Sequence, residues 1–130
     1  MAQEKLGEAA ATLERYLTEK PDSLGGWNLV RTVHWRRNDI PACREATRRL
    51  CVLNAQAGLY EAAWQDYEEF INLGGDKMPP GTWLELCRVP EERNDYKRAL
   101  SEYEKLAAAH PSERQGLTAQ LGAARILLKR

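Results

Sequence analysis

The stretch NDYKRALSEYEKLAAAHPS, from Asn94 to Ser112, carries the pattern that decides the fold. Its apolar residues recur at offsets that place them on one face of an α-helix. They are Tyr96, Ala99, Leu100, Tyr103, Leu106 and Ala107. Asn94-Asp95 provides a start for this helix, and Pro111 stops it because the residue before a proline avoids the helical region. The stretch therefore predicts one amphipathic helix.

The same apolar stripe occurs three more times in the chain. It is present in KLGEAAATLERYLTEKPD, in GLYEAAWQDYEEFINLGGD and, interrupted by Arg44, in RNDIPACREATRRLCVLNA. The stripe that begins at Leu6 recurs at Ile40, and the stripe at Tyr60 recurs after a closely similar interval at Tyr96. An interval of this length fits two helices and two short turns. The chain therefore has the form of a helical repeat.

Two tryptophans support the long period, since Trp27 lies as far before Ile40 as Trp83 lies before Tyr96. A Trp-bearing helix thus comes before two of the striped helices. We predict an all-α fold. Its seven helices are expected at 3–19, 23–37, 41–56, 59–73, 80–89, 94–109 and 113–129. The helix at 41–56 should serve both its predecessor and its successor, because the interval from Ile40 to Tyr60 has room for only one helix and one turn.

This pattern resembles the tetratricopeptide repeat, a helix–turn–helix unit of about 34 residues. Trp27 and Trp83 match its opening aromatic, and Pro21 and Pro111 match its terminal proline. The small residue of its second helix is matched by Ala9, Cys43, Ala63 and Ala99. The resemblance implies an α-solenoid, or superhelix, of about seven antiparallel helices. Arg31 and Cys87 stand where the family favours glycine, and His34 and Pro90 where it favours tyrosine. We expect Pro90 to shorten or kink its helix.

Composition allows one domain over residues 1–130, possibly part of a longer chain. Nineteen basic residues balance nineteen acidic ones, so no net charge attracts the chain to nucleic acid or an anionic membrane. No apolar run approaches the length that a membrane-spanning helix needs, and no signal peptide is evident. The three cysteines are an odd number. We therefore expect a cytoplasmic protein with free, buried thiols.

The sequence contains no catalytic constellation, so we expect a protein that is not an enzyme and needs neither cofactor nor metal. Neither His34 nor His110 has a metal-ligand companion three or four residues away. The glycine-rich stretch at 74–81 lacks the ending of a phosphate loop and is interpreted as a turn. Adjacent acidic pairs such as Glu91-Glu92 are interpreted as solvated faces.

Six arginines lie between residues 31 and 49, whereas five acidic residues and no basic one lie between 61 and 76. The arginines are Arg31, Arg36, Arg37, Arg44, Arg48 and Arg49. Two adjacent helices could pair these opposite charges. Alternatively, the arginines form a patch for a partner that bears carboxylates or phosphates. Nucleic-acid binding is a lesser alternative, with Trp35 beside Arg36 as its only stacking candidate.

The resemblance implies a non-enzymatic protein–protein interaction module or scaffold that holds a partner segment in a concave groove. By position, the groove residues would be Asn28, Thr32, Trp35, Arg36, Arg48, Glu85 and Arg88. The lysine and asparagine set of chaperone-binding members is absent. The partner is expected to be a protein or peptide, possibly acidic. As an alternative, the stretch from Tyr60 is similar to repeat segments of bacterial rhomboid-type membrane proteases, which would make this a regulatory or substrate-positioning domain.

The last predicted helix is apolar on two faces. One face carries Leu117, Leu121, Ala124 and Leu128, and the other carries Ala123, Ile126 and Leu127. A helix with two apolar faces expects neighbours on two sides. We expect either that the natural chain continues with another helix or that this face pairs weakly with a second copy.

Overall fold

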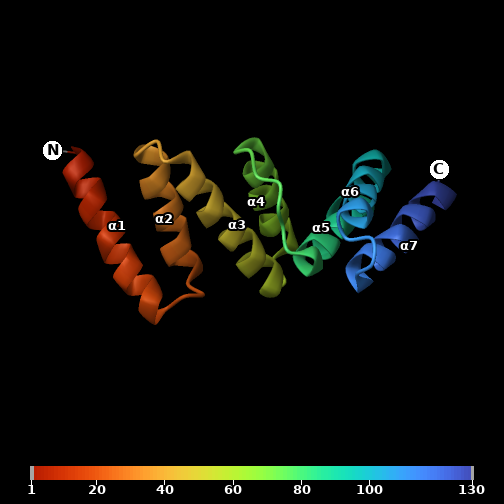
Figure 1. Cartoon of the computed structure of the whole chain (residues 1–130), viewed down its shortest axis with the longest axis horizontal. Helices are drawn as coiled ribbons and strands as arrows, with labels where there is room; N and C mark the ends of the chain where they lie inside the picture. The colour runs from red at the N-terminus through yellow and green to blue at the C-terminus, as the bar shows by residue number, and fades with distance from the viewer. Residues whose placement is uncertain (1, 130) are drawn as a thin grey trace. The chain divides into compact units, whose positions relative to one another are not determined.

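The computed structural model describes residues 2–129, and that part of the chain consists of helices and connections without a strand. The helices are α1 (Ala2–Glu19), α2 (Leu24–Arg36), α3 (Ile40–Gln56), α4 (Tyr60–Asn72), α5 (Pro80–Glu92), α6 (Tyr96–Ala109) and α7 (Arg114–Lys129), shown in Figure 1. Each of the seven expected helices is present. The all-α class is therefore confirmed.

Helix contacts divide the chain into two compact units, one up to Asp76 and one from Lys77 onward. In the first unit α1 packs on α2, α2 on α3 and α3 on α4. In the second unit α6 packs on both α5 and α7, and α5 also contacts α7. Within each unit, a helix thus packs mainly on its neighbours in sequence. The expectation of one domain for the whole chain stays a prediction.

Four connections share one backbone geometry, in which a helix is followed by a residue with positive φ. These residues are Asn38, Gly58, Gly74 and Asn94, with φ of 57°, 78°, 87° and 62°. A residue of this conformation lets the next backbone N–H groups bond back to the open carbonyls of the last turn. In the two Arg-Asn-Asp connections the aspartate also caps the next helix, because Asp39 accepts from the Ala42 N–H and Asp95 from the Arg98 N–H. The repeated tripeptide is therefore a helix–turn–helix joint.

The small residues of the stripes lie where helices approach each other. Cys43, Ala63 and Ala99 are all 0% exposed. The Cys51 thiol lies 3.3 Å from the carbonyl oxygen of Ala63, which brings α3 and α4 close together. The expected burial is confirmed at these three positions, whereas Ala9, the small residue of the first stripe, is only half-buried.

The helix α3 packs against both α2 and α4 and carries eight buried residues, which are Cys43, Ala46, Thr47, Leu50, Cys51, Val52, Leu53 and Ala55. It has the double role expected from the short spacing. Arg44, which interrupts its stripe, is half-buried, and its Nε donates to the carbonyl of Leu73 at 2.7 Å. That bond satisfies a carbonyl just past the end of α4.

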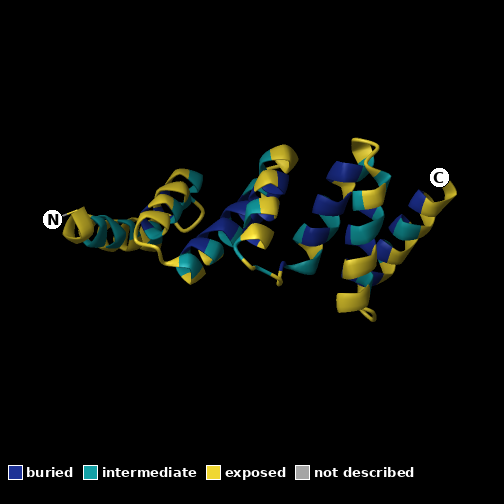
Figure 2. Ribbon diagram, turned by 90° about the horizontal axis from the view of Figure 1, so that it is seen from above, coloured by how far each residue is buried: buried dark blue, intermediate teal, exposed yellow. Residues whose placement is uncertain are grey.

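By contrast, α1 has no buried residue, and Figure 2 shows it without the dark blue of the other helices. Its stripe is only partly covered, with Leu13 and Leu17 half-buried and Tyr16 47% exposed. The first helix is thus attached through one incompletely covered face.

Two expectations are wrong. The helix expected to end at residue 89 continues to Glu92, because a proline in the last turn removes only its own N–H, and the Pro90 carbonyl accepts the Asp95 N–H at 2.8 Å. The pair Glu91-Glu92 is not uniformly solvated either. The side chain of Glu91 is only 10% exposed, because Arg125 of α7 binds it, whereas Glu92 is exposed.

Candidate functional site

The side of α2 that faces away from the core carries four of the expected groove residues. Asn28, Thr32, Trp35 and Arg36 are all exposed. Trp35 is the largest of them and has 57% of its surface exposed. Leu29, which is 58% exposed, lies at the edge of the same face. Sequence reasoning missed Leu29, although a leucine between polar positions of a helix was a usable signal.

A shallow cleft of about 240 Å³ adjoins Trp35 in the first unit. It is lined by Arg31, Thr32, Trp35, Cys43 and Glu69. The cleft combines an aromatic ring, a hydroxyl group and a carboxylate. Such a mixture suits the side chains of a peptide better than a purely apolar ligand.

Arg31 fixes one wall of this cleft. Its Nη1 contacts Asp66 Oδ1 at 3.1 Å and Glu69 Oε2 at 3.2 Å, so it joins α2 to α4. The Asn54 amide of α3 donates to the other oxygen of Asp66 at 2.7 Å. Burial raises the pKa of Asp66, and the bonds from Asn54 and Arg31 oppose that rise. The wall is therefore a hydrogen-bonded network across three helices.

Most of the arginine cluster is engaged inside the chain. Arg48 pairs with Glu45 on its own helix, and Arg49 reaches Asp22 at 3.2 Å. Arg31 and Arg44 are also bonded within the chain, so four of the six arginines have partners there. The expected pairing of the arginine-rich segment with the acidic segment at 61–76 is confirmed for Arg31. Arg36 and Arg37 are exposed and are the members that a partner could reach.

The remaining expected groove residues lie on helices other than α2. Arg48 lies on α3 and does not line the cleft. Glu85 and Arg88 lie on α5 of the second unit, where Glu85 is half-buried and Arg88 is exposed. Arg88 lines a polar cleft of about 460 Å³ in that unit, together with Glu91, Glu92, Asn94, Arg125 and Lys129.

A strong ionic contact forms the centre of that polar cleft. Arg125 donates two hydrogen bonds to the Glu91 carboxylate, from Nε at 2.7 Å and from Nη2 at 2.9 Å. The Tyr103 hydroxyl donates to the same carboxylate at 2.7 Å. The Arg125 guanidinium in particular lowers the pKa of Glu91 to about 2. Burial and this carboxylate raise the pKa of Tyr103. The cluster ties α5, α6 and α7 together, which gives it a structural role.

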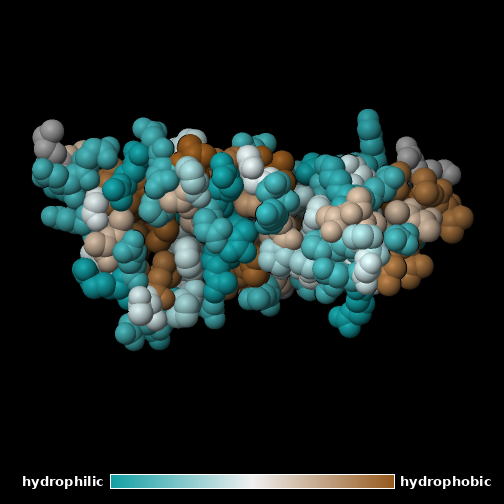
Figure 3. All heavy atoms as spheres, in the orientation of Figure 1, coloured by the Kyte–Doolittle hydropathy of each residue, from teal (hydrophilic) through white to brown (hydrophobic). Residues whose placement is uncertain are grey.

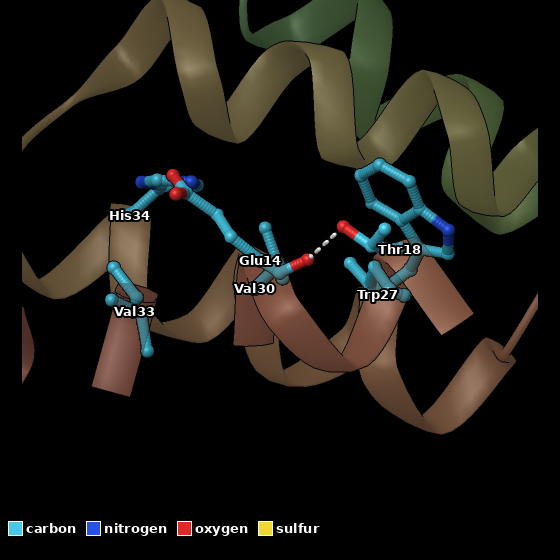
Figure 4. A pocket seen from close by; sticks show the side chains of 8 residues that line it. Glu14, Thr18, Trp27, Val30, Val33 and His34 are labelled. Atoms are coloured by element: carbon cyan, nitrogen blue, oxygen red, sulfur yellow. Dashed lines mark hydrogen bonds between the residues drawn. The ribbon is translucent and has the colours of Figure 1, made fainter. Parts of the chain in front are cut away.

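A third, more apolar pocket of about 420 Å³ lies between α1 and α2. It is lined by Ala10, Glu14, Leu17, Thr18, Trp27, Val30, Val33 and His34. Figure 4 shows Trp27 and His34 at opposite ends, with Val30 between them. Nδ1 of His34 is buried and has no hydrogen-bond partner among residues 2–129. Sequence reasoning missed this pocket, which exists because the stripe of α1 is incompletely covered.

Two buried carboxylates occupy equivalent places, one residue before a stripe tyrosine. Asp66 precedes Tyr67, and Glu102, only 2% exposed, precedes Tyr103. Oε2 of Glu102 accepts from the indole N–H of Trp83 at 3.0 Å. Each carboxylate thus binds a side chain of a helix earlier in its own unit.

The chain matches no family model, and neither curated proteins nor solved structures show a significant match to it. None of the helices within residues 2–129 is long and apolar enough to cross a membrane. Within the same residues, no three histidine, cysteine or acidic side chains are grouped so that they could hold a metal ion.

Proposed function

We propose that this chain is a non-enzymatic protein–protein interaction module built from tetratricopeptide-like helix pairs. The pair α2–α3 and the pair α5–α6 support it because the turns that connect their helices correspond. Asn38 and Asn94 both have positive φ, and Asp39 and Asp95 both cap the following helix. A recurring helix pair is the unit from which an α-solenoid is stacked.

The exposed face of α2 is the proposed binding surface, and the main support for it is the solvent exposure of the Trp35 side chain. A tryptophan with 57% exposure leaves apolar surface in water, whereas Trp64 and Trp83 are buried in their units. Tryptophan and arginine are the residues that most often dominate the energy of protein interfaces. Trp35, with Arg36 and the adjoining cleft, offers an aromatic anchor beside a charge that can bind a carboxylate.

The partner is proposed to be a peptide segment with an acidic residue next to an apolar one. Arg36 would bind the acidic side chain, while Trp35 and Leu29 would cover the apolar one. Nucleic acid is less well supported, because four of the six clustered arginines already have partners in the chain.

A pull-down from the source cells with matched charge reversals tests this function. Arg36→Glu should lose bound proteins that the wild type retains. Arg37→Glu makes the same charge change one residue away, outside the face formed by Asn28, Thr32 and Trp35, and should retain them. Equal recovery by both variants and the wild type would contradict the proposed surface.

A further inference from the structure

The helix α7 carries a row of exposed apolar residues that its own unit leaves uncovered. Leu117, Leu121 and Leu128 are 52%, 70% and 88% exposed, and Ala124 between them is also exposed. Ile126, on the opposite side of the helix, is 0% exposed. Figure 3 shows the hydrophobic surface gathered at this end of the second unit. We call the four exposed residues the leucine ridge.

The spacing of the leucine ridge is four, three and four residues, which is the spacing of the seam between two packed helices. This spacing is the same when the helix is followed in the reverse direction. A second copy of α7 that runs antiparallel would therefore place every ridge residue opposite another one. Leu117 would face Leu128 of the second copy, and Leu121 would face Ala124, so that a large residue meets a small one.

We propose that the leucine ridge is a self-complementary interface through which two copies of this chain associate, with their α7 helices antiparallel. Contacts of this kind are isologous, as expected of a two-fold dimer. The charges beside the ridge allow it. Arg125 would face the uncharged Gln120 of the second copy, and Glu91 pairs with Arg125 and Lys129 in its own chain, so that one carboxylate offsets part of their positive charge.

The interface is small, because a helix of 16 residues is only about 24 Å long. Interfaces of this size are weak. We therefore expect a dissociation constant on the order of 10–100 µM, so that the dimer forms reversibly over an accessible range of concentration.

Sedimentation velocity of the full chain over a hundredfold concentration range tests the association. The wild type should pass from monomer to dimer, and Leu121→Lys should weaken the dimer at least tenfold. Leu59→Lys is the matched control, since Leu59 is an exposed leucine of the other unit that lies in neither proposed surface, and it should leave the dimer unchanged. Circular dichroism should show all three chains folded alike. A monomeric wild type, or a dimer that survives Leu121→Lys, would overturn the proposal.

Disulfide trapping tests the antiparallel arrangement. In an antiparallel dimer the two copies of residue 117 lie about 16 Å apart, too far for a disulfide. A mixture of Leu117→Cys and Leu128→Cys chains should therefore cross-link under mild oxidation, whereas Leu117→Cys alone should not. The native Cys43, Cys51 and Cys87 are buried and free, so they should add little background. Cross-linking of Leu117→Cys alone would show a parallel pair and overturn the geometry.

This interface is independent of the proposed function, because it lies on another helix of another unit. Leu121→Lys should leave peptide binding unchanged, and Trp35→Ala should leave the dimer unchanged. If the chain is monomeric but the leucine ridge binds an acidic amphipathic helix, the occupant is a different protein and the proposal of a second copy is wrong.

Discussion

At the scale of single residues, small side chains in the stripes contribute to the packing of both units, and the ion pair between Glu91 and Arg125 contributes to that of the second unit. Ala63 and Ala99 are fully buried, so a longer side chain at either position would have to be accommodated inside the core. Glu91 bonds to both α6 and α7, so its charge state affects three helices at once.

Enlarging the small stripe residues should destabilise the chain. Ala63→Leu and Ala99→Leu should each lower the free energy of unfolding by about 1–3 kcal/mol, because the extra carbon atoms force neighbouring helices apart. Glu104→Leu, on the exposed side of α6, should change it by no more than about 0.5 kcal/mol. Chemical denaturation measures all three. Similar losses at buried and exposed positions would mean that the stripe is misassigned.

The Glu91 carboxylate should make the second unit sensitive to acid. Its folded pKa of about 2 lies below the ordinary value of 4.5, so it stabilises the folded state above that pH and loses this effect as the pH falls toward 2. Because Arg125 and Lys129 are about half exposed, we expect a loss of about 1–2 kcal/mol rather than the full shift.

Denaturation at a series of pH values tests this contribution. Glu91→Gln should be less stable than the wild type at neutral pH and should lose less stability between about pH 5 and 2.5. Glu92→Gln, which changes the exposed neighbour, should keep the slope of the wild type. If both variants show the wild-type slope, Glu91 is not the group responsible.

At the scale of elements, the connections define each unit as much as the helices do. Gly58 follows α3 with φ of 78°, and a Cβ atom there would meet no other atom within 4 Å. Any cost of a side chain at this position therefore comes from the backbone conformation alone. A substitution at Gly58 therefore measures the cost of the positive φ without any steric clash.

Gly58→Ala should lower the free energy of unfolding by about 1 kcal/mol, because alanine disfavours positive φ. Gly25→Ala, in the first turn of α2 of the same unit, should raise it by about 0.5–1 kcal/mol, because its Cβ would meet only Ser23 at 3.9 Å. Thermal and urea denaturation measure both changes. A Gly58→Ala chain as stable as the wild type would show that this turn relaxes without cost.

The helices were predictable from the sequence because their apolar stripes and start signals are local. Gly58 and the two Asn-Asp pairs mark their turns in the same local way. The cleft beside Trp35 and the cluster around Glu91 could not be predicted from the sequence, because both depend on which helices pack against each other. Arg125 lies far from Glu91 in the sequence, and no periodicity links the two. The exposure of Trp35 was likewise decided by packing, since Trp27 on the same helix is half-buried.

At the scale of the whole molecule, the described chain offers two separate surfaces, one in each unit. The face of α2 around Trp35 is proposed for a partner segment, and the leucine ridge of α7 for a second copy. A chain that binds through both would present two partner sites in one dimer, which raises its apparent affinity for a multivalent partner. Substitution of Trp35 should disrupt only the first surface, and substitution of Leu121 only the second.

Binding of short peptides by the face of α2 is the most direct test of the central claim. Peptides selected from a random display library against the wild-type chain would be titrated by calorimetry into wild type, Trp35→Ala and Leu59→Ala. Leu59 is an exposed leucine between α3 and α4 and serves as the control. We expect Trp35→Ala to weaken binding at least tenfold, about 1.4 kcal/mol or more, and Leu59→Ala to change it less than twofold. Equal affinity of all three chains for the selected peptides would contradict the account.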